Sequence, residues 1–454
     1  MHYPSHNIAV LLAGGKGTRF GSSLPKQFVK LAGKYIIDYT IDAFNTHDLI
    51  DEIIIVASQD HHDRLWQLCK AKKYDKVKKI VNSGQDRFGS TYSALLAMND
   101  SDPSTKVLFH DAVRPLIDEA TITATLEALD HYDAVDTAID ATDTIIRIDE
   151  KRHIVEIPKR TFMKRGQTPQ GFRLGTIIKA YKKAVEVDKR DFTCDCGVVN
   201  ELLPNIDIYV VPSKEKNIKI THPIDLHIAE KYIQMGTDQE FSNIHLEQLK
   251  NKKIVIFGHS SGIGKEISKL AEDFGAQVYG ASRSTGLDIT NKNKVAEFLS
   301  SIRSEIDIVI NTAAILTKKP LEIMSYKEIM EIININYIGT INVAYASKKY
   351  LQETKGMLIN FSSSSYTRGR ANYALYSSSK AAVVNLTQAL SEEWSDDKIR
   401  VNCINPERTL TPMRVKNFGI EPPETLLDPI IVAEKTLKTA LGDISGMIID
   451  VKQN

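Results

Sequence analysis

Residues 8–19 read IAVLLAGGKGTR, and residues 254–264 read IVIFGHSSGIG. In each stretch an apolar, β-type run leads directly into a glycine-rich turn. A strand, a loop and then a helix is the order found at nucleotide sites, because the loop and the helix N-terminus direct backbone N–H groups at an anion. The two stretches lie in opposite halves of the 454-residue chain. The sequence therefore predicts two different nucleotide sites in one polypeptide.

The bulk composition agrees with a two-domain enzyme. A chain of this length fits two cores of roughly 200 residues each. The net charge is +1 and 25% of the residues are charged, so we expect no nucleic-acid partner and no membrane insertion. Few cysteines, no leader-like segment and no apolar run near the roughly 20 residues of a membrane span predict a cytoplasmic protein. Cys194 and Cys196 lack a nearby cluster of further ligands, so no zinc site is expected.

Strand-like and helix-like segments alternate in both halves, which is typical of the α/β class. In the first half, strand-like runs are expected at 52–58, 106–109 and 134–138, with helices at 35–44 and 61–71. In the second half, runs at 277–281, 306–310, 358–362 and 400–404 are expected to be strands. A polar segment separates the two series. We expect domains at 1–235 and 251–454, joined by a linker at 236–250.

The first glycine turn is followed by Arg19 and by Lys26 within a Pro-Lys-Gln triplet. Backbone donors and two fixed cations around one polyphosphate suit phosphoryl transfer, whose catalysis is mostly positioning and charge neutralisation. The turn is not a Walker loop, because no Gly-Lys-Ser/Thr stands at the required spacing. Taken alone, the turn could equally be a tight strand-to-helix connection.

The rest of the first half carries further motifs. They are GQDRFGS at 84–90, HDAVRP at 110–115, QTPQ at 167–170 and NIKIT at 217–221, with Asp143-Thr144 between them. Together with the glycine turn, they closely resemble the cytidylyltransferases that act on methylerythritol phosphate and ribitol phosphate. The resemblance covers about residues 5–235. It implies a nucleotidyltransferase-type, Rossmann-like α/β domain that transfers CMP from CTP to a polyol phosphate with Mg²⁺.

The same resemblance implies a role for each matching residue. Arg19 and Lys26 are expected to be catalytic, and Asp111 to take part in metal binding. The residues expected to bind CTP are Ala13, Gly14, Gly15, Gly17, Gly84, Gln85, Arg87 and Ser90. Those expected to bind the polyol phosphate are Asp111, Arg114, Thr144, Arg160, Thr168 and Lys219. A simpler interpretation of Asp111 is a turn carboxylate, and of Arg114 a surface ion pair. One departure concerns the acceptor side, since Pro158-Lys159-Arg160 stands where family members acting on methylerythritol phosphate commonly carry Asp-Arg after Thr-Val.

The second glycine turn has the spacing Gly-x3-Gly-x-Gly, and further motifs follow it in order. They are NTAA at 311–314, NYIG at 336–339, SSS at 362–364, YSSSK at 376–380 and RVN at 400–402. This set resembles the short-chain dehydrogenase/reductase family over about residues 251–454 and implies its Rossmann fold. Two departures are NTAA in place of the usual Asn-Asn-Ala-Gly and Pro406-Glu407 in place of Pro-Gly.

Tyr376 and Lys380 stand four residues apart, hence on one face of a helix. An ammonium there can lower the pKa of the phenol, and the phenol can then act as general acid in carbonyl reduction. On its own, such a pair is usually a solvated helix face. By the resemblance, Ser363 orients the carbonyl and Asn336 anchors a water chain to Lys380. Neighbouring serines leave the position of the orienting serine uncertain by one residue.

Arg283 lies at the end of the second strand, where an NAD enzyme usually carries an acid against the ribose 2′-OH. A cation there favours the 2′-phosphate of NADPH, although an exposed arginine beside a turn is the simpler interpretation. Asp288 is expected to contact the adenine. The residues expected to bind the cofactor are Gly258, Ser260, Ser261, Gly262, Ile263, Gly264, Arg283, Asp288, Asn311, Ala313, Tyr376 and Lys380.

A polyol-phosphate cytidylyltransferase joined to a carbonyl reductase predicts two consecutive reactions. NADPH would reduce ribulose 5-phosphate to ribitol 5-phosphate, and CTP would convert that product to CDP-ribitol for a capsule or other surface polysaccharide. Another ketopentose phosphate, giving CDP-arabitol or CDP-xylitol, stays open. So does an inactive domain that serves only binding or assembly. Short-chain reductases usually pair through the Tyr-x3-Lys helix, so we expect a homodimer.

Overall fold

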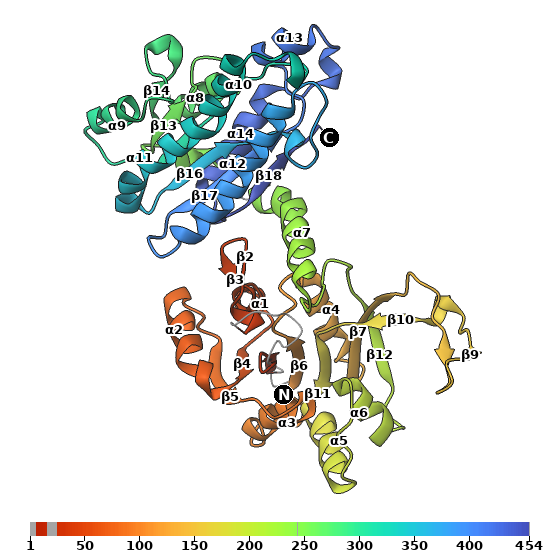
Figure 1. The fold of residues 1–454 in the computed structure, drawn as a ribbon. Coiled ribbons are helices and arrows are strands. Elements are labelled where there is room, and N and C mark those ends of the chain that lie inside the picture. Colours follow the sequence, from red (N-terminus) through yellow and green to blue (C-terminus); the bar gives the residue numbers. More distant parts are fainter. Residues whose placement is uncertain (1–5, 16–24, 243, 454) are drawn as a thin grey trace. The chain divides into compact units, whose positions relative to one another are not determined.

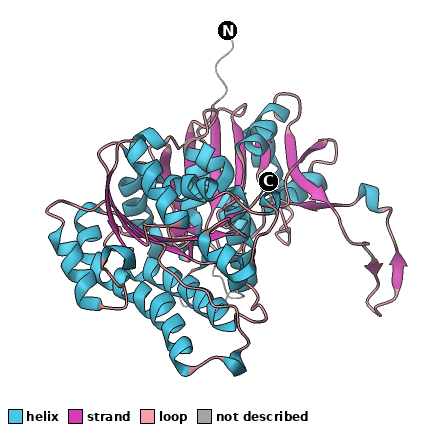
Figure 2. Cartoon of the chain, turned by 90° about the horizontal axis from the view of Figure 1, so that it is seen from above, coloured by secondary structure: helices cyan, strands magenta, loops and turns pink. Residues whose placement is uncertain are grey.

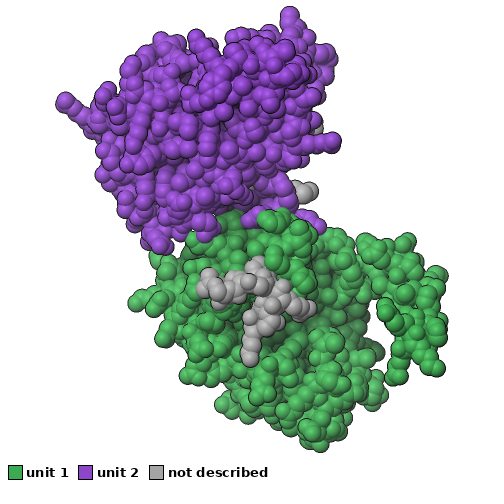
Figure 3. All heavy atoms as spheres, in the orientation of Figure 1, with its two compact units in different colours: residues 1–229 green, residues 230–454 purple. Residues whose placement is uncertain are grey.

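The computed structural model describes residues 6–15, 25–242 and 244–453, residues 235–242 by their backbone alone. The chain forms two compact units, Met1–Ala229 and Glu230–Asn454 (Figure 3). Their boundary lies inside helix α7 (Pro223–Ser242), whose end overlaps the start of the predicted linker. Among the described residues, no helix combines the length and the apolar character that a membrane span requires.

Unit 1 is built on an eight-stranded mixed sheet (Figure 1). The order is β10-β7-β11-β6-β1-β4-β5, with β12 also paired to β7. Strand β11 runs antiparallel to both β6 and β7, whereas β1, β4, β5 and β6 are parallel. The strands are β1 (Asn7–Leu12), β4 (Glu52–Ala57), β5 (Val77–Asn82), β6 (Lys106–Asp111), β7 (Ala134–Asp140), β10 (Lys164–Gly166), β11 (Gln170–Arg173) and β12 (Ile208–Pro212).

Helices cover both faces of this sheet because its central strands are apolar on both sides. In β1, Ala9 and Leu11 join one core cluster, whereas Ile8 and Val10 join the other. This split follows from the two-residue period of a strand. The first cluster includes residues of α1 (Ile36–Asn45), α2 (His62–Lys72) and α4 (Glu119–Ala128). The second includes residues of α3 (Arg87–Ala97), α5 (Leu174–Glu186) and α6 (Asp195–Leu202).

The order of the parallel strands fixes where a ligand can bind in unit 1. From β1 the chain moves outward to β4 and β5, and then returns to the other side of β1 to form β6. In α/β sheets, ligands bind outside the carboxyl ends of the strands where the order reverses in this way. That point lies between β1 and β6. The glycine turn follows β1, and Asp111 is the last residue of β6.

An arm formed by residues 141–163 extends from the sheet of unit 1 (Figures 1 and 2). It carries the short antiparallel strands β8 (Arg147–Ile148) and β9 (Ile154–Glu156). Its apolar side chains are largely exposed; Phe162 is 73% exposed and Ile157 is 59% exposed. The arm therefore contributes little to the core of the unit.

Unit 2 contains a six-stranded sheet in the order β14-β13-β15-β16-β17-β18, and every pair in it is parallel. The strands are β13 (Lys253–Phe257), β14 (Gln277–Ala281), β15 (Ile308–Asn311), β16 (Met357–Phe361), β17 (Arg400–Pro406) and β18 (Ile448–Val451). The strand order reverses between β13 and β15, so the ligand crevice is expected at their carboxyl ends. The predicted α/β class, with two Rossmann-like units, is confirmed.

Helices also flank the sheet of unit 2. Residues of α9 and α11 share one core cluster with Val255 and Phe257 of β13. Outside this cluster, α8 and α14 contact each other. The helices are α8 (Gly262–Asp273), α9 (Lys292–Ser301), α10 (Tyr326–Ile333), α11 (Gly339–Thr354), α12 (Ala374–Glu393), α13 (Pro412–Phe418) and α14 (Pro429–Leu441).

Substituting Gly84 by alanine should destabilise unit 1. An added Cβ would lie 2.3 Å from the carbonyl carbon of Gly89, a backbone atom that cannot turn away. Overpacking of this kind costs about 1–3 kcal/mol, so the melting temperature of unit 1 in calorimetry should fall by several degrees. Gly15→Ala is the matched control, because no atom of the described residues lies within 4 Å of a Cβ at that glycine. Equal melting temperatures for the two variants would contradict the close approach.

Candidate functional site

The candidate site of unit 1 begins where β1 ends. The side-chain amide of Gln27 donates to the carbonyl oxygen of Ala13 at 2.8 Å. A Cβ on Gly14 would lie 2.3 Å from the Cβ of Ser83, so only glycine allows the turn to approach the end of β5 so closely. The predicted residues Gly17 and Arg19 lie outside the described residues.

The N-terminus of α3 faces this turn. Asp86 caps the helix by accepting from the backbone N–H of Gly89 at 2.7 Å. The buried Ser90 lies in the first turn of α3, with its hydroxyl 3.5 Å from the Cβ position of Gly14. Gln85 is exposed just before the helix. A capped helix end beside a glycine turn presents free N–H groups and the positive end of the helix dipole to an anion.

Asp111 is the centre of the charge cluster in this site. One carboxylate oxygen accepts from Arg87 Nη1 at 3.0 Å, and the other lies 3.1 Å from both Arg114 Nε and Lys219 Nζ. Burial favours the neutral acid, but Lys219, Arg87 and Arg114 outweigh it and hold the pKa of Asp111 well below its usual range. The side chain of Asp111 therefore stays ionised at neutral pH.

Lys26 reaches the same place from another element. It opens the short helix Lys26–Phe28, and its Nζ lies 3.3 Å from the carbonyl oxygen of Ile220. Ile220 directly follows Lys219, which pairs with Asp111. The fold thus brings together residues that are almost 200 positions apart in the sequence.

Thr168 and His110 hold the backbone behind Asp111. The N–H of Asp111 donates to Thr168 Oγ1 at 3.1 Å. His110 Nε2 lies 3.2 Å from the carbonyl oxygen of Arg114, which can only accept, so this nitrogen carries the proton and Nδ1 accepts from the Thr168 hydroxyl. Burial lowers the pKa of His110 to about 4, against a smaller opposing effect of Asp111. The imidazole is therefore neutral, and the cations around Asp111 come from Arg87, Arg114 and Lys219.

A further residue of this site is Asp195, which is fully buried at the start of α6. Its carboxylate accepts from Arg87 Nη2 at 2.7 Å, Thr91 Oγ1 at 2.9 Å and Tyr181 Oη at 2.6 Å. Arg87, expected at CTP, thus bridges Asp195 and Asp111. No local pattern marks Asp195, because its partners come from distant helices.

Two residues predicted for the acceptor lie elsewhere. Thr144 and Arg160 are exposed on the arm, where Arg160 Nη1 donates to the carbonyl oxygen of Thr142. In the part of the chain that the structure describes, no contact joins either of them to Asp111. The structure therefore gathers Asp111, Arg114, Thr168 and Lys219 but not these two.

The candidate site of unit 2 is a cavity of about 860 Å³ that runs from the second glycine turn to Tyr376. Gly258 has φ +86°, and a Cβ there would lie 2.6 Å from Thr312 Oγ1. At Gly264 a Cβ would lie 2.3 Å from the carbonyl oxygen of Gly258. The turn is packed so tightly against the β15 end that larger residues do not fit.

Tyr376, Lys380 and Ser363 meet at the inner wall of this cavity. The Ser363 hydroxyl hydrogen-bonds Tyr376, whereas Ser362 Oγ donates to the carbonyl oxygen of Lys380 at 3.0 Å. Within the described serine run, the geometry thus distinguishes Ser363 from its neighbour. Lys380 Nζ donates to the carbonyl oxygen of Phe361 at 2.8 Å and lies 5.7 Å from the centre of the Tyr376 ring.

The expected lowering of the phenol pKa is absent in the protein alone. Burial raises the pKa of Tyr376 to about 12, partly offset by the hydrogen bond from Ser363. The Lys380 ammonium is directed at a backbone carbonyl, and burial lowers its own pKa to about 8. Tyr376 is therefore protonated at neutral pH, which is the state that a proton donor needs.

Asn336 is fully buried in a short π-helical segment, Asn334–Ile338. Its side chain accepts from the N–H of Ile315 at 2.8 Å and donates to the carbonyl oxygen of the same residue at 2.9 Å. It also donates to Ser379 Oγ at 3.2 Å, one residue before Lys380. These bonds fix the amide next to the helix that carries the Tyr376 and Lys380 pair.

The other end of the cavity is lined by Arg283 and Asp288. Arg283 is 59% exposed, and its nearest acid is Glu331 at 3.8 Å. Asp288 accepts from the N–H of Thr290. Asn311 lies beneath the lining, where its side-chain oxygen accepts from the N–H of Ala313 at 3.3 Å. A cation accessible at the end of β14 is suited to bind a phosphate.

Two family models match the chain, one over each unit. A family model described as 2-C-methyl-D-erythritol 4-phosphate cytidylyltransferase matches residues 7–235. A model described as enoyl-(acyl carrier protein) reductase matches residues 250–427.

Individual relatives match one unit or both. The bifunctional ribulose 5-phosphate reductase/CDP-ribitol pyrophosphorylase of Haemophilus influenzae is 45% identical over 98% of this chain and 95% of its own length. The 2-C-methyl-D-erythritol 4-phosphate cytidylyltransferase of Thermobifida fusca is 39% identical over 52% of this chain and 98% of its own length. The crystal structure of 4-diphosphocytidyl-2C-methyl-D-erythritol synthase from Anaerococcus prevotii aligns with a TM-score of 0.45 and 29% identity, over 51% of this chain and 97% of that one.

Substituting Asp111 by asparagine should destabilise unit 1 markedly, because Arg87 and Arg114 would lose a buried counter-charge. Breaking a buried pair on one side costs about 3–5 kcal/mol. The melting temperature of unit 1, followed by calorimetry, should fall by roughly 6–20 °C.

Asp140→Asn is the control for this variant. Asp140 also pairs with a cation, Lys164, but its side chain is 83% exposed. An exposed pair contributes about 0–1 kcal/mol, so this variant should melt within a few degrees of the parent. A fall as large as that of Asp111→Asn would contradict the argument from burial.

Proposed function

This chain belongs to the family of bifunctional ribulose 5-phosphate reductase/CDP-ribitol pyrophosphorylases, and we propose that it makes CDP-ribitol in two steps. Unit 2 reduces D-ribulose 5-phosphate to D-ribitol 5-phosphate. Unit 1 then transfers CMP from CTP to this product and releases pyrophosphate. The observation that carries the proposal is the presence of both sites in one chain that aligns along 98% of its length with such an enzyme.

For the reduction we assign the proton transfer to Tyr376. The bound nicotinamide supplies the hydride, which goes to the ketone carbon of the substrate. Tyr376 donates its phenolic proton to the ketone oxygen, and Ser363 holds that oxygen by a second hydrogen bond. Lys380 and Asn336 then return a proton to Tyr376 through water. The high pKa of the phenol supports the donor role, because the group enters the reaction protonated.

For the transfer we assign charge neutralisation to unit 1. An oxygen of the ribitol 5-phosphate attacks the α-phosphorus of CTP, and the bond to the pyrophosphate oxygen breaks. Arg19 and Lys26 would stabilise the charge on the CTP phosphates, and Arg114 and Lys219 would hold the acceptor phosphate. The glycine turn and the N-terminus of α3 would hold the nucleotide.

The residues of unit 1 fit a magnesium ion that arrives with CTP. Mg²⁺ in phosphoryl-transfer sites commonly takes one or two carboxylates and completes its shell with phosphates and water. Asp111 is ionised, and among the described residues its Oδ1 accepts one contact, from Arg87, which leaves acceptor capacity for a metal. We propose Asp111 as the protein ligand of this ion, which would supply positive charge against the phosphates of CTP.

The reductase unit implies a nicotinamide cofactor, and we propose that this cofactor is NADPH. Support comes from Arg283, which lines the cavity at the end of β14 where the 2′-phosphate would lie. We further propose that the enzyme is a cytoplasmic homodimer. The four cysteines are all free thiols, as in a reducing compartment. The homodimer would pair through α12, the helix that carries Tyr376 and Lys380.

A coupled assay tests the two steps and their order. Purified protein with ribulose 5-phosphate should oxidise NADPH. After CTP and Mg²⁺ are added, it should release one pyrophosphate per NADPH consumed, and NMR of the product should show CDP-ribitol. Tyr376→Phe should abolish the reduction but leave the transfer to supplied ribitol 5-phosphate intact. NADPH oxidation without any CDP-alditol would refute the proposal, and CDP-arabitol or CDP-xylitol would move it to another ketopentose phosphate.

The reductase should lose activity as the pH rises through about 8. Lys380, with a pKa of about 8, loses its positive charge in this range, whereas Tyr376, with a pKa of about 12, keeps its proton. The measurement is kcat/KM for ribulose 5-phosphate at saturating NADPH between pH 6 and 10, since this ratio reports the ionisation of the enzyme form that binds the sugar phosphate. A ratio that stays flat up to pH 10 would show that the charge of Lys380 is not needed.

A further inference from the structure

The cavity of unit 2 extends beyond Tyr376, on the side away from Arg283. Arg370, Tyr373 and Phe418 line that part of the wall. The rings of Tyr373 and Tyr376 meet edge to face at 6.4 Å between centroids, so the two side chains form one surface. A substrate whose ketone reaches Tyr376 must place its remaining carbons and its phosphate within this part of the cavity.

The arginines around that part of the cavity differ in whether a carboxylate neutralises them. Arg414 is bound by Glu421 through two contacts of 2.6 and 2.8 Å. Arg408 faces the same carboxylate at 3.9 Å. Arg370 also lines the cavity and is exposed, yet within the described part of the chain its guanidinium makes no hydrogen bond or ion pair.

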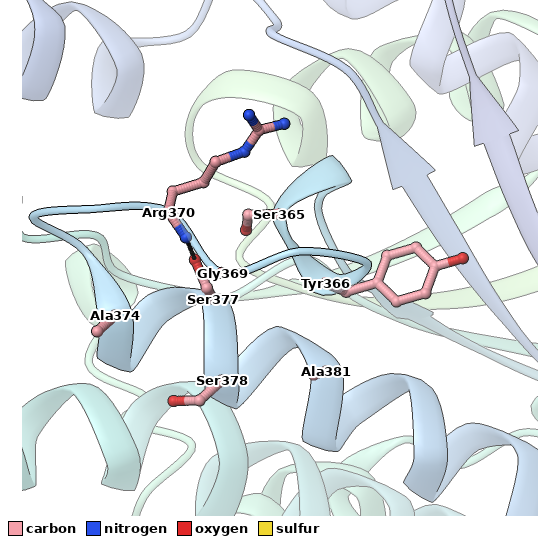
Figure 4. A pocket seen from close by; sticks show the side chains of 8 residues that line it. All are labelled: Ser365, Tyr366, Gly369, Arg370, Ala374, Ser377, Ser378 and Ala381. Atoms are coloured by element: carbon pink, nitrogen blue, oxygen red, sulfur yellow. Dashed lines mark hydrogen bonds between the residues drawn. The ribbon is translucent and has the colours of Figure 1, made fainter.

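The backbone of Arg370 is nevertheless held. Its N–H donates to Ser377 Oγ at 3.4 Å, and Ser377 is buried in α12 next to Tyr376. Figure 4 shows this bond and shows the Arg370 side chain extending away from Ser377, with its guanidinium clear of the other labelled side chains. An anchored backbone with an unengaged, accessible guanidinium is the arrangement expected of an anion-binding residue.

We propose that Arg370 binds the phosphate group of the sugar phosphate that unit 2 reduces. This inference rests on the proposed reduction of a ketopentose phosphate. Guanidinium and phosphate pair through two parallel hydrogen bonds, and a phosphate monoester carries between one and two negative charges at neutral pH. The residues that would hold the phosphates of the cofactor are separate ones, namely the glycine turn and Arg283. Arg370 therefore selects for a phosphorylated substrate over the free sugar.

Arg370→Gln tests the assignment through the ratio of kcat/KM for the phosphorylated sugar to kcat/KM for the free sugar. For the parent and the variant, kcat/KM is measured with ribulose 5-phosphate and with unphosphorylated ribulose, and KM is measured for NADPH. Loss of a charge-assisted contact should lower kcat/KM for ribulose 5-phosphate by about 10- to 100-fold. The value for ribulose should change little, so the preference for the phosphorylated sugar falls by the same factor. Arg370→Lys should recover part of it, because it keeps the charge but loses the paired geometry.

Controls separate this role from a structural one. Arg368→Gln removes another exposed arginine of the same loop, one that does not line the cavity, and it should leave the preference unchanged. The KM for NADPH and the cytidylyl transfer to supplied ribitol 5-phosphate should be those of the parent in every variant.

The other possible outcomes refute either the role of Arg370 or the proposed function. A parent that reduces ribulose 5-phosphate, together with an Arg370→Gln variant that keeps its preference, would overturn the assignment alone. A rise in KM for NADPH at unchanged preference would also overturn it, by placing Arg370 at a cofactor phosphate. A parent that does not reduce ribulose 5-phosphate would refute the proposed function, and the assignment with it.

Discussion

Both candidate sites depend on one constraint of space, which is that a glycine turn must lie directly against a neighbouring segment where parallel strands end. In unit 1 the turn after β1 approaches the end of β5, and in unit 2 the turn after β13 approaches the end of β15. A Cβ at Gly14, Gly84, Gly258 or Gly264 would lie within 2.6 Å of a neighbouring atom. The strand order determines which ends are adjacent, and the absence of side chains allows backbone N–H groups to reach a phosphate.

The two units differ in how a buried charged group is compensated by its neighbours. Unit 1 surrounds the carboxylate of Asp111 with Lys219, Arg87 and Arg114, so that acid stays ionised in spite of burial. Unit 2 buries Lys380 without a carboxylate partner among the described residues, and burial shifts its pKa toward neutrality. The first arrangement suits a reaction in which highly charged phosphates are held still. The second suits a reaction in which a proton must move, because a group that titrates near neutral pH can both give and take it.

Much of this architecture is predictable from the sequence. The strand expected at 277–281 matches β14 (Gln277–Ala281), and the helix expected at 35–44 corresponds to α1 (Ile36–Asn45), since apolar period and turn residues act locally. Contacts between distant segments are not predictable in this way. Asp195 accepts from three donors on other helices, and Arg87 pairs with two carboxylates that are distant from it in the sequence. The pKa of Tyr376 also departs from expectation, because spacing along a helix does not reveal that Lys380 is directed at a backbone carbonyl.

The bond that anchors the loop at position 370 has an evolutionary consequence. Ser377 accepts it from a backbone N–H, not from the arginine side chain. Almost any amino acid at position 370 can therefore make the same bond, and the loop would keep its place beside α12. The side chain there is free to vary without disturbing the neighbouring Tyr376 and Lys380. A lineage of such reductases could thus come to accept neutral or differently charged sugars as substrates through single substitutions at position 370. The proton-transfer residues would stay where they are.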